Sequence, residues 1–94
     1  MNQSPHWYIY MIRCSLGTIY TGVTIDVARR FNEHQSQSKK CAKYLRGKNP
    51  LKLIHFEQVS DKKSAYRLEA KIKKLTKAEK EHYLVSAESI NPET

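Results

Sequence analysis

Residues 7–23 read WYIYMIRCSLGTIYTGV, and this stretch decides the fold. Segments 7–14 and 18–23 are rich in aromatic and β-branched residues, which favour strands. Between them, Ser15-Leu16-Gly17 has the composition of a tight turn. We therefore predict an antiparallel hairpin that is apolar enough to be covered on at least one face. The hairpin carries three tyrosines: Tyr8, Tyr10 and Tyr20.

A helix is predicted directly after the hairpin, over about 26–35, with its first residue, an aspartate, as the N-cap. Val27 and Phe31 are four residues apart and form its buried stripe. Arg30 and His34 are a second pair with the same spacing, near the edge of that stripe. The helix therefore presents a cation and an imidazole one turn apart.

The rest of the chain predicts one more strand and three helices. The predicted segments are a polar loop (36–40), a short helix stopped by Gly47 (41–46), a strand (51–59), a helix (61–75) and a last helix (76–85). Leu51, Leu53 and His55 alternate along the strand and are expected on one face. The order β-β-α-α-β-α-α predicts an α+β fold, with a three-stranded antiparallel sheet flanked by helices.

Start signals and an apolar stripe define the last two helices. Either Ser60 or Asp61 caps the first of them, and Thr76 to Glu79 has the form of a capping box that starts the second. The core-facing stripe of the first consists of Ala65, Leu68, Ile72 and Leu75. A polar tail follows over 86–94, and Asn91 to Thr94 are expected to fray.

Length and composition predict a single domain. The 94 residues are 39% apolar, which suffices for one modest core. No run of eighteen apolar residues and no secretory signal are visible, so we expect a cytoplasmic protein without a membrane span. Cys14 and Cys41 have no metal-site spacing, and we expect reduced, buried thiols.

The charge predicts a polyanionic partner. Seventeen Lys and Arg stand against nine Asp and Glu, a net charge of +8. A cation docked on a nucleic-acid phosphate releases a counterion, which favours binding; membrane lipids and acidic proteins also suit this charge, and the charge alone does not choose. The candidate nucleic-acid-binding residues are Arg13, Arg29, Lys39, Lys40, Lys43, Arg46, Lys48 and the cluster of Lys71, Lys73 and Lys74.

Glu69 is the most informative acidic residue, because it borders the apolar stripe of the 61–75 helix. A carboxylate there loses solvation unless a cation compensates it. That cation is either one of the many lysines or a hard metal ion. Mg²⁺ is often held by one or two carboxylates together with phosphate oxygens and water.

Arg30, His34 and the tyrosines of the hairpin each allow two interpretations. Arg30 is either a surface arginine or a bidentate phosphate ligand. His34 is either exposed or a proton carrier or phosphate ligand, since it titrates near neutrality. The tyrosines are sheet aromatics unless a nearby cation lowers the pKa of a hydroxyl.

Taken together, these residues resemble the GIY-YIG nuclease superfamily over roughly residues 6–84. The first tripeptide corresponds to Tyr8-Ile9-Tyr10 and the second to Tyr20-Thr21-Gly22. The segments Asp26 to His34 and Ala65 to Glu69 follow where the family has its arginine, histidine and glutamate. The chain is most similar to the short stand-alone subfamily whose members consist of this domain only.

The resemblance implies a DNA endonuclease that hydrolyses phosphodiesters with one Mg²⁺ or Mn²⁺, bound weakly without nucleic acid. It implies that Glu69 holds the metal and that Arg30 stabilises charge on the phosphate. It implies that Tyr20, assisted by His34 or Tyr10, orients or deprotonates the attacking water.

Four departures from the family pattern keep other functions open. One is that no asparagine in a helical context is visible near the C-terminus, since Asn91 lies in the tail. Tyr8 stands where the family name has glycine, and Val23 stands where some relatives carry a lysine. A second domain that would select a DNA site is not visible. The alternatives are a nucleic-acid-binding module with a vestigial nuclease site, and an adaptor that needs a protein partner to supply the DNA-targeting surface.

Overall fold

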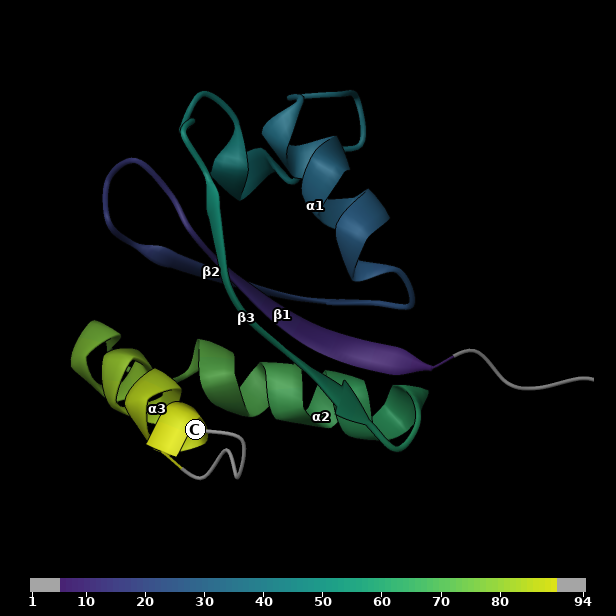
Figure 1. Cartoon of the computed structure of the whole chain (residues 1–94), viewed down its shortest axis with the longest axis vertical. Coiled ribbons are helices and arrows are strands. Elements are labelled where there is room, and N and C mark those ends of the chain that lie inside the picture. The colour runs from purple at the N-terminus through teal and green to yellow at the C-terminus, as the bar shows by residue number, and fades with distance from the viewer. Residues whose placement is uncertain (1–5, 90–94) are drawn as a thin grey trace, which may run out of the picture.

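The computed structural model describes residues 6–89 and has a three-stranded sheet between two layers of helix (Figure 1). The elements are β1 (Trp7–Arg13), β2 (Ile19–Thr24), α1 (Val27–Gln35), the 3₁₀ helix η1 (Lys43–Leu45), β3 (Lys52–Val59), α2 (Lys62–Lys73) and α3 (Lys77–Ser89). The strand order is β2-β1-β3, and β1 pairs antiparallel with both neighbours. The predicted fold class is confirmed.

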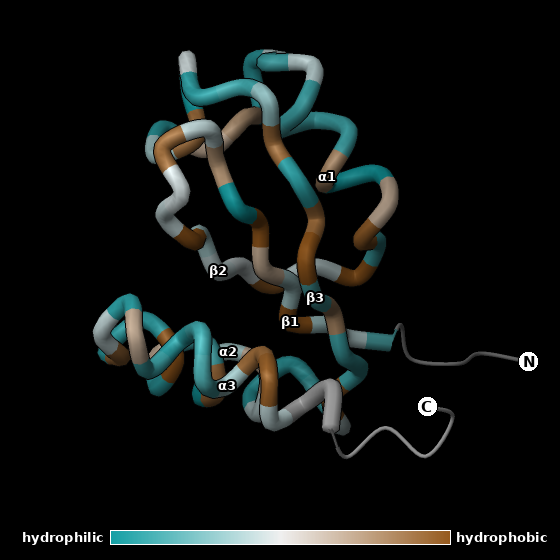
Figure 2. The backbone as a smooth tube through the Cα atoms, turned by 60° about the vertical axis from the view of Figure 1, so that its left-hand side comes forward, coloured by the Kyte–Doolittle hydropathy of each residue, from teal (hydrophilic) through white to brown (hydrophobic). Residues whose placement is uncertain are grey.

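The central strand β1 divides the core into two halves, because successive side chains of a strand point to opposite faces. Tyr10 and Ile12 are buried on the face covered by α1. Ile9 and Met11 are buried on the other face, with residues of α2 and α3. Figure 2 shows the same layers: the strands lie between α1 on one side and the α2–α3 pair on the other.

A β-bulge in β3 corrects one sequence prediction. Met11 of β1 is paired with His55, whereas the next residue, Ile12, is paired with Leu53, so Ile54 is an extra residue in the ladder. The bulge reverses the alternation of side chains beyond it. Leu53 therefore packs on the α1 face while His55 contacts Tyr83 of α3, and the prediction that both share one face is wrong.

The predicted N-terminal caps are confirmed. The carboxylates of Asp26 and Asp61 accept from backbone N–H groups at the starts of α1 and α2, at 3.0 and 2.7 Å. Thr76 and Glu79 form the reciprocal bonds of a capping box, at 2.8 and 3.1 Å. The caps could be predicted from the sequence because each depends on residues only three positions apart in the chain.

The predicted ends of the helices are less accurate. The helix predicted over 41–46 is a single 3₁₀ turn, Lys43–Leu45, and after Arg46 comes Gly47 with φ +71°. Helix α2 ends two residues before the predicted boundary at Leu75. In its last turn the backbone N–H groups bond to carbonyls three residues earlier instead of four. Helix α3 continues to Ser89, beyond the predicted Val85, because no glycine or proline interrupts it. The predicted fraying of Asn91 to Thr94 lies outside the described residues.

Two further predictions can be compared with the structure. Cys14 and Cys41 are buried and free, as expected. Within residues 6–89 no helix has the length and apolarity that a membrane crossing requires.

Gly22 of β2 lies directly opposite Tyr10 of β1. A Cβ atom on Gly22 would overlap the Tyr10 hydroxyl and lie 2.8 Å from its Cε1. We therefore expect Gly22→Ala to lower the free energy of unfolding by about 1–3 kcal/mol, as overpacking does, measured by urea denaturation. Because the hydroxyl is the nearest atom, Tyr10→Phe should recover part of the loss in the double variant. Additive losses would contradict this account.

Candidate functional site

His34 lies in the middle of the group of predicted site residues and is fully buried, with 0% of its surface exposed. Its Nδ1 accepts from the backbone N–H of Ala42 at 3.2 Å. An amide N–H only donates, so the neutral ring carries its proton on Nε2. Nε2 lies 2.9 Å from the Tyr10 hydroxyl and donates to it. Burial, and secondarily the charge of Arg30, lowers the pKa of His34 to about 4.

Tyr10 and Tyr20 bring the two strands of the hairpin to His34. The Tyr10 ring lies 6.1 Å from that of Tyr20, which lies 5.5 Å from the imidazole of His34. Burial raises the pKa of the Tyr10 hydroxyl; the nearby Tyr20 adds to the rise and the guanidinium of Arg30 opposes it. Tyr10 is therefore a protonated phenol at neutral pH, and Tyr20 is the less buried of the two.

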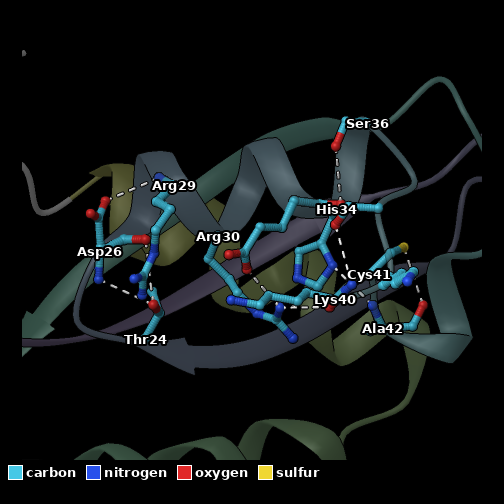
Figure 3. A network of polar contacts seen from close by, with 12 residues as sticks. Thr24, Asp26, Arg29, Arg30, His34, Ser36, Lys40, Cys41 and Ala42 are labelled. Atoms are coloured by element: carbon cyan, nitrogen blue, oxygen red, sulfur yellow. Dashed lines mark hydrogen bonds and ion pairs between the residues drawn. The ribbon is translucent and has the colours of Figure 1, made fainter.

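Arg30 lies beside His34, one turn earlier on α1 (Figure 3). Its Nη1 donates to Glu33 Oε1 at 2.9 Å and to the carbonyl of Lys40 at 2.7 Å. Both bonds use one nitrogen of a guanidinium that has five N–H donors. The side chain is thereby held in place, close enough to Tyr10 for its charge to oppose the rise of the pKa of the Tyr10 hydroxyl.

Glu69 is separated from this group by the sheet. It lies on α2, which packs on the face opposite α1 with Leu68 and Ile72 in the core. Its side chain is 17% exposed and forms an ion pair with Lys73 at 3.2 Å. The structure thus brings Tyr10, Tyr20, Arg30 and His34 together, and places Glu69 across the sheet with a lysine as its cation.

A pocket of about 350 Å³ connects the two sides at the edge of the sheet. β2 is the edge strand, and its residues alternate between the faces. Tyr20 pairs with Ile12 on the α1 side, whereas Thr21 pairs with Met11 on the α2 side. The residues that line the pocket are Ile19, Tyr20, Thr21, Tyr44, Lys73 and Lys80. Lys73 therefore contacts both Glu69 and the pocket that Tyr20 lines.

Two of the predicted nucleic-acid-binding residues, both arginines, make hydrogen bonds that hold segments of the chain together. Arg13 makes two bonds to the carboxylate of Glu81 on α3, at 2.8 and 2.9 Å, and fixes α3 to the hairpin. Arg46 donates to the carbonyls of Ser38 and Lys39, each at 3.0 Å. Their guanidinium groups tie segments of the chain to one another. The remaining candidates are exposed, except Lys48, which is half-buried: Arg29, Lys39, Lys40, Lys43, Lys71, Lys73 and Lys74.

Sequence reasoning missed Tyr44, which extends the row of aromatic rings. Its ring lies 5.8 Å from that of Tyr20, and its hydroxyl donates to Thr18 at 2.8 Å. The ammonium of Lys48 lies 4.0 Å from the Tyr44 ring centroid. No spacing rule links residue 44 to the hairpin, because a loop brings it there; only the contact itself reveals it.

The family of this chain follows from its sequence and its fold together. A model described as the GIY-YIG catalytic domain matches residues 6–83. The match includes β1, β2, α1 and α2, and with them each of the five predicted site residues. The chain belongs to the GIY-YIG family.

Proteins similar to this chain include several named UPF0213 proteins. The chain is 48% identical over 82 residues to a UPF0213 protein of Citrobacter koseri, covering 87% of this chain and 80% of that protein. It is 47% identical over 83 residues to the UPF0213 protein YhbQ of Salmonella typhimurium, covering 88% and 81%.

Two solved structures share the fold. The UPF0213 protein BH0048 of Bacillus halodurans is 38% identical with a TM-score of 0.56, covering 92% of this chain and 88% of that one. The protein EF2693 of E. faecalis is 36% identical with a TM-score of 0.63, covering 94% and 92%. The resemblance predicted from the tripeptides is thus confirmed at the level of family and fold.

The lowered pKa of His34 predicts a pH dependence of stability. The unfolded chain binds a proton at His34 near pH 6.5, whereas the folded protein binds it near pH 4. Stability should therefore fall as the pH is lowered from 6.5 to 4, by on the order of 3 kcal/mol. Urea denaturation at a series of pH values measures this loss. His34→Gln should remove it and the exposed-site control His82→Gln should not; equal pH slopes in both variants would contradict the assignment.

Proposed function

We propose that this protein is a divalent-metal-dependent DNA endonuclease that hydrolyses phosphodiester bonds. The observation that carries the proposal is the buried His34–Tyr10 pair, which lies directly behind a half-exposed Tyr20 and beside the fixed guanidinium of Arg30. Burial of an imidazole and a phenol is costly unless both are satisfied. A cluster of this kind next to an unsaturated arginine fits a reaction at a phosphate.

In this reaction Arg30 binds the phosphate and stabilises the charge that builds on its oxygens. Glu33 and the Lys40 carbonyl hold the guanidinium in one position, so binding costs little further ordering. The guanidinium keeps its charge at every relevant pH. Arg30 is accordingly the residue whose loss should affect the rate most directly.

Tyr20 is the tyrosine that contacts the attacking water, because Tyr10 and His34 are buried and bonded to each other. His34 is neutral and its Nδ1 is occupied by the Ala42 amide, so it acts as a positioning residue for Tyr10. Tyr10 in turn packs against Tyr20 and restricts its ring. Tyr20 orients the water or accepts its proton.

Glu69 can supply one of the ligands of the metal ion that the family implies. Within residues 6–89 no cluster of three His, Cys, Asp or Glu side chains could hold an ion alone. One carboxylate of low exposure suits Mg²⁺ or Mn²⁺ when water and substrate phosphate supply the other oxygens. When bound, the ion would neutralise the leaving oxygen and polarise the phosphate.

One observation favours a second function, a nucleic-acid-binding module without turnover. Glu69 already has a cation, Lys73, at 3.2 Å, and the net charge of +8 suits a phosphate backbone. In that case the protein would bind DNA with or without a metal ion. A partner protein that supplies a targeting surface is compatible with both functions.

Cleavage of branched, single-stranded and duplex DNA in Mg²⁺ or Mn²⁺ distinguishes these functions. We expect Arg30→Ala and Glu69→Gln each to lower the rate by about 10²–10³-fold, as loss of one preorganised electrostatic group does. Tyr20→Phe should lower it by about 10²-fold or more, because the hydroxyl oxygen that orients or deprotonates the water is lost. The measurement is the single-turnover rate at saturating enzyme.

Arg67→Ala is the matched control, since Arg67 is an exposed arginine of α2 that lies outside the cluster. Its rate should equal that of the unmodified protein. Cleavage that survives both Arg30→Ala and Glu69→Gln would assign the activity to another site. Binding of the same DNA without any cleavage would favour the binding module.

A further inference from the structure

The pocket at the edge of β2 has the composition of an anion site that the proposed reaction does not use. Lys73 of α2 and Lys80 of α3 line it, and among the described residues no acidic side chain does. Tyr20 lies at its border with the α1 side. Lysines from two different helices therefore line the same pocket as the tyrosine assigned to the attacking water.

Thr21 gives this pocket an unsatisfied polar group. Its side chain is 2% exposed, and within residues 6–89 its Oγ1 has no hydrogen-bond partner. Buried hydroxyls are normally bonded, so an orphaned one indicates a missing partner. Thr21 lines the pocket but its Oγ1 is itself buried, so a phosphate oxygen or a water in the pocket would supply that partner only after a neighbouring group moves.

Lys73 connects the pocket to the carboxylate of Glu69. The pair is an i, i+4 contact in which Glu69 is 17% exposed and Lys73 is 53% exposed. Such exposed pairs are weak and easily exchanged. A phosphate in the pocket competes for the ammonium of Lys73, whereas a divalent cation competes for the carboxylate of Glu69. Each ligand therefore breaks the ion pair between Glu69 and Lys73, the phosphate by binding the ammonium and the cation by binding the carboxylate.

We propose that this pocket binds a second phosphate of the DNA strand, adjacent to the phosphate held by Arg30, and that Lys73 moves from Glu69 to that phosphate. The movement frees Glu69 for the divalent cation. Phosphate and metal thus bind together, and the free protein holds the metal weakly because Lys73 occupies the site. The inference rests on the proposed role of Glu69 as metal ligand.

The first arm of the test measures Mn²⁺ binding without nucleic acid, by paramagnetic broadening of the amide signals of residues 68–70. Lys73→Met should bind Mn²⁺ about twofold to fivefold more tightly than the unmodified protein, because the competing ammonium is gone. Lys63→Met, which removes a charge near the other end of α2, should bind Mn²⁺ as the unmodified protein does. Glu69→Gln should abolish the broadening.

The second arm measures binding of a fluorescent 12-nucleotide single strand in EDTA, by anisotropy over a range of salt concentrations. Lys73→Met and Lys80→Met should each weaken binding and reduce the salt slope by about one, as loss of one phosphate contact does. Lys63→Met should leave the slope unchanged. Removal of any positive charge favours a cation and disfavours a polyanion, so the effects of Lys73→Met on both ligands must exceed those of Lys63→Met.

Equal Mn²⁺ affinities of Lys73→Met and Lys63→Met would overturn the inference, as would an unchanged salt slope in Lys80→Met. Lys73→Gln repeats both measurements with a polar side chain of similar length. If cleavage depends on Glu69 but these variants behave alike, the hydrolysis stands and the coupling is wrong. If no DNA is cut but Lys73 acts in opposite directions, the coupling stands and the hydrolysis is wrong.

Discussion

The burial of Tyr10 between the sheet and α1 is the constraint on which the rest of the structure depends. Its ring fills the space opposite Gly22, where no other residue leaves room for it, and its hydroxyl ends at Nε2 of His34. A phenol in that position needs a hydrogen-bond partner. The partner must come from α1, which fixes how the helix is rotated on the sheet.

His34 also fixes the position of the loop that follows α1. Its second nitrogen accepts from the Ala42 amide, so the segment after the helix must return to the imidazole. The side chain of Gln37 holds this return, with its Nε2 donating to the carbonyls of His34 and Leu45 at 3.0 and 3.2 Å. Tyr44 is thereby carried to Tyr20. The buried pair of Tyr10 and His34 thus arranges the hairpin, α1 and the loop that follows it around the half-buried Tyr20.

The edge position of β2 gives the site its second half. A central strand would be covered on both sides and would keep the two faces of the sheet apart. At an edge, Tyr20 on one face and Thr21 on the other border the same pocket, which Lys73 and Lys80 enter. The protein therefore brings groups from both faces of its sheet to one pocket without a cleft between domains.

Several features that depend on near neighbours in the chain could be predicted from the sequence alone: the hairpin, the caps at Asp26 and Asp61, and the pairing of Arg30 with His34 on one helix. The order and spacing of the site residues along the chain also predicted the family. The sequence also identified Glu69 as a carboxylate that needs a cation. Only the tertiary structure decided that His34 is buried and neutral, that a bulge turns His55 to the other face, and that Lys73 is the cation of Glu69. The physical reason is that burial, tautomer and ion pairing depend on residues brought together from distant elements, or on which of several lysines lies nearest, and neither periodicity nor spacing carries that information.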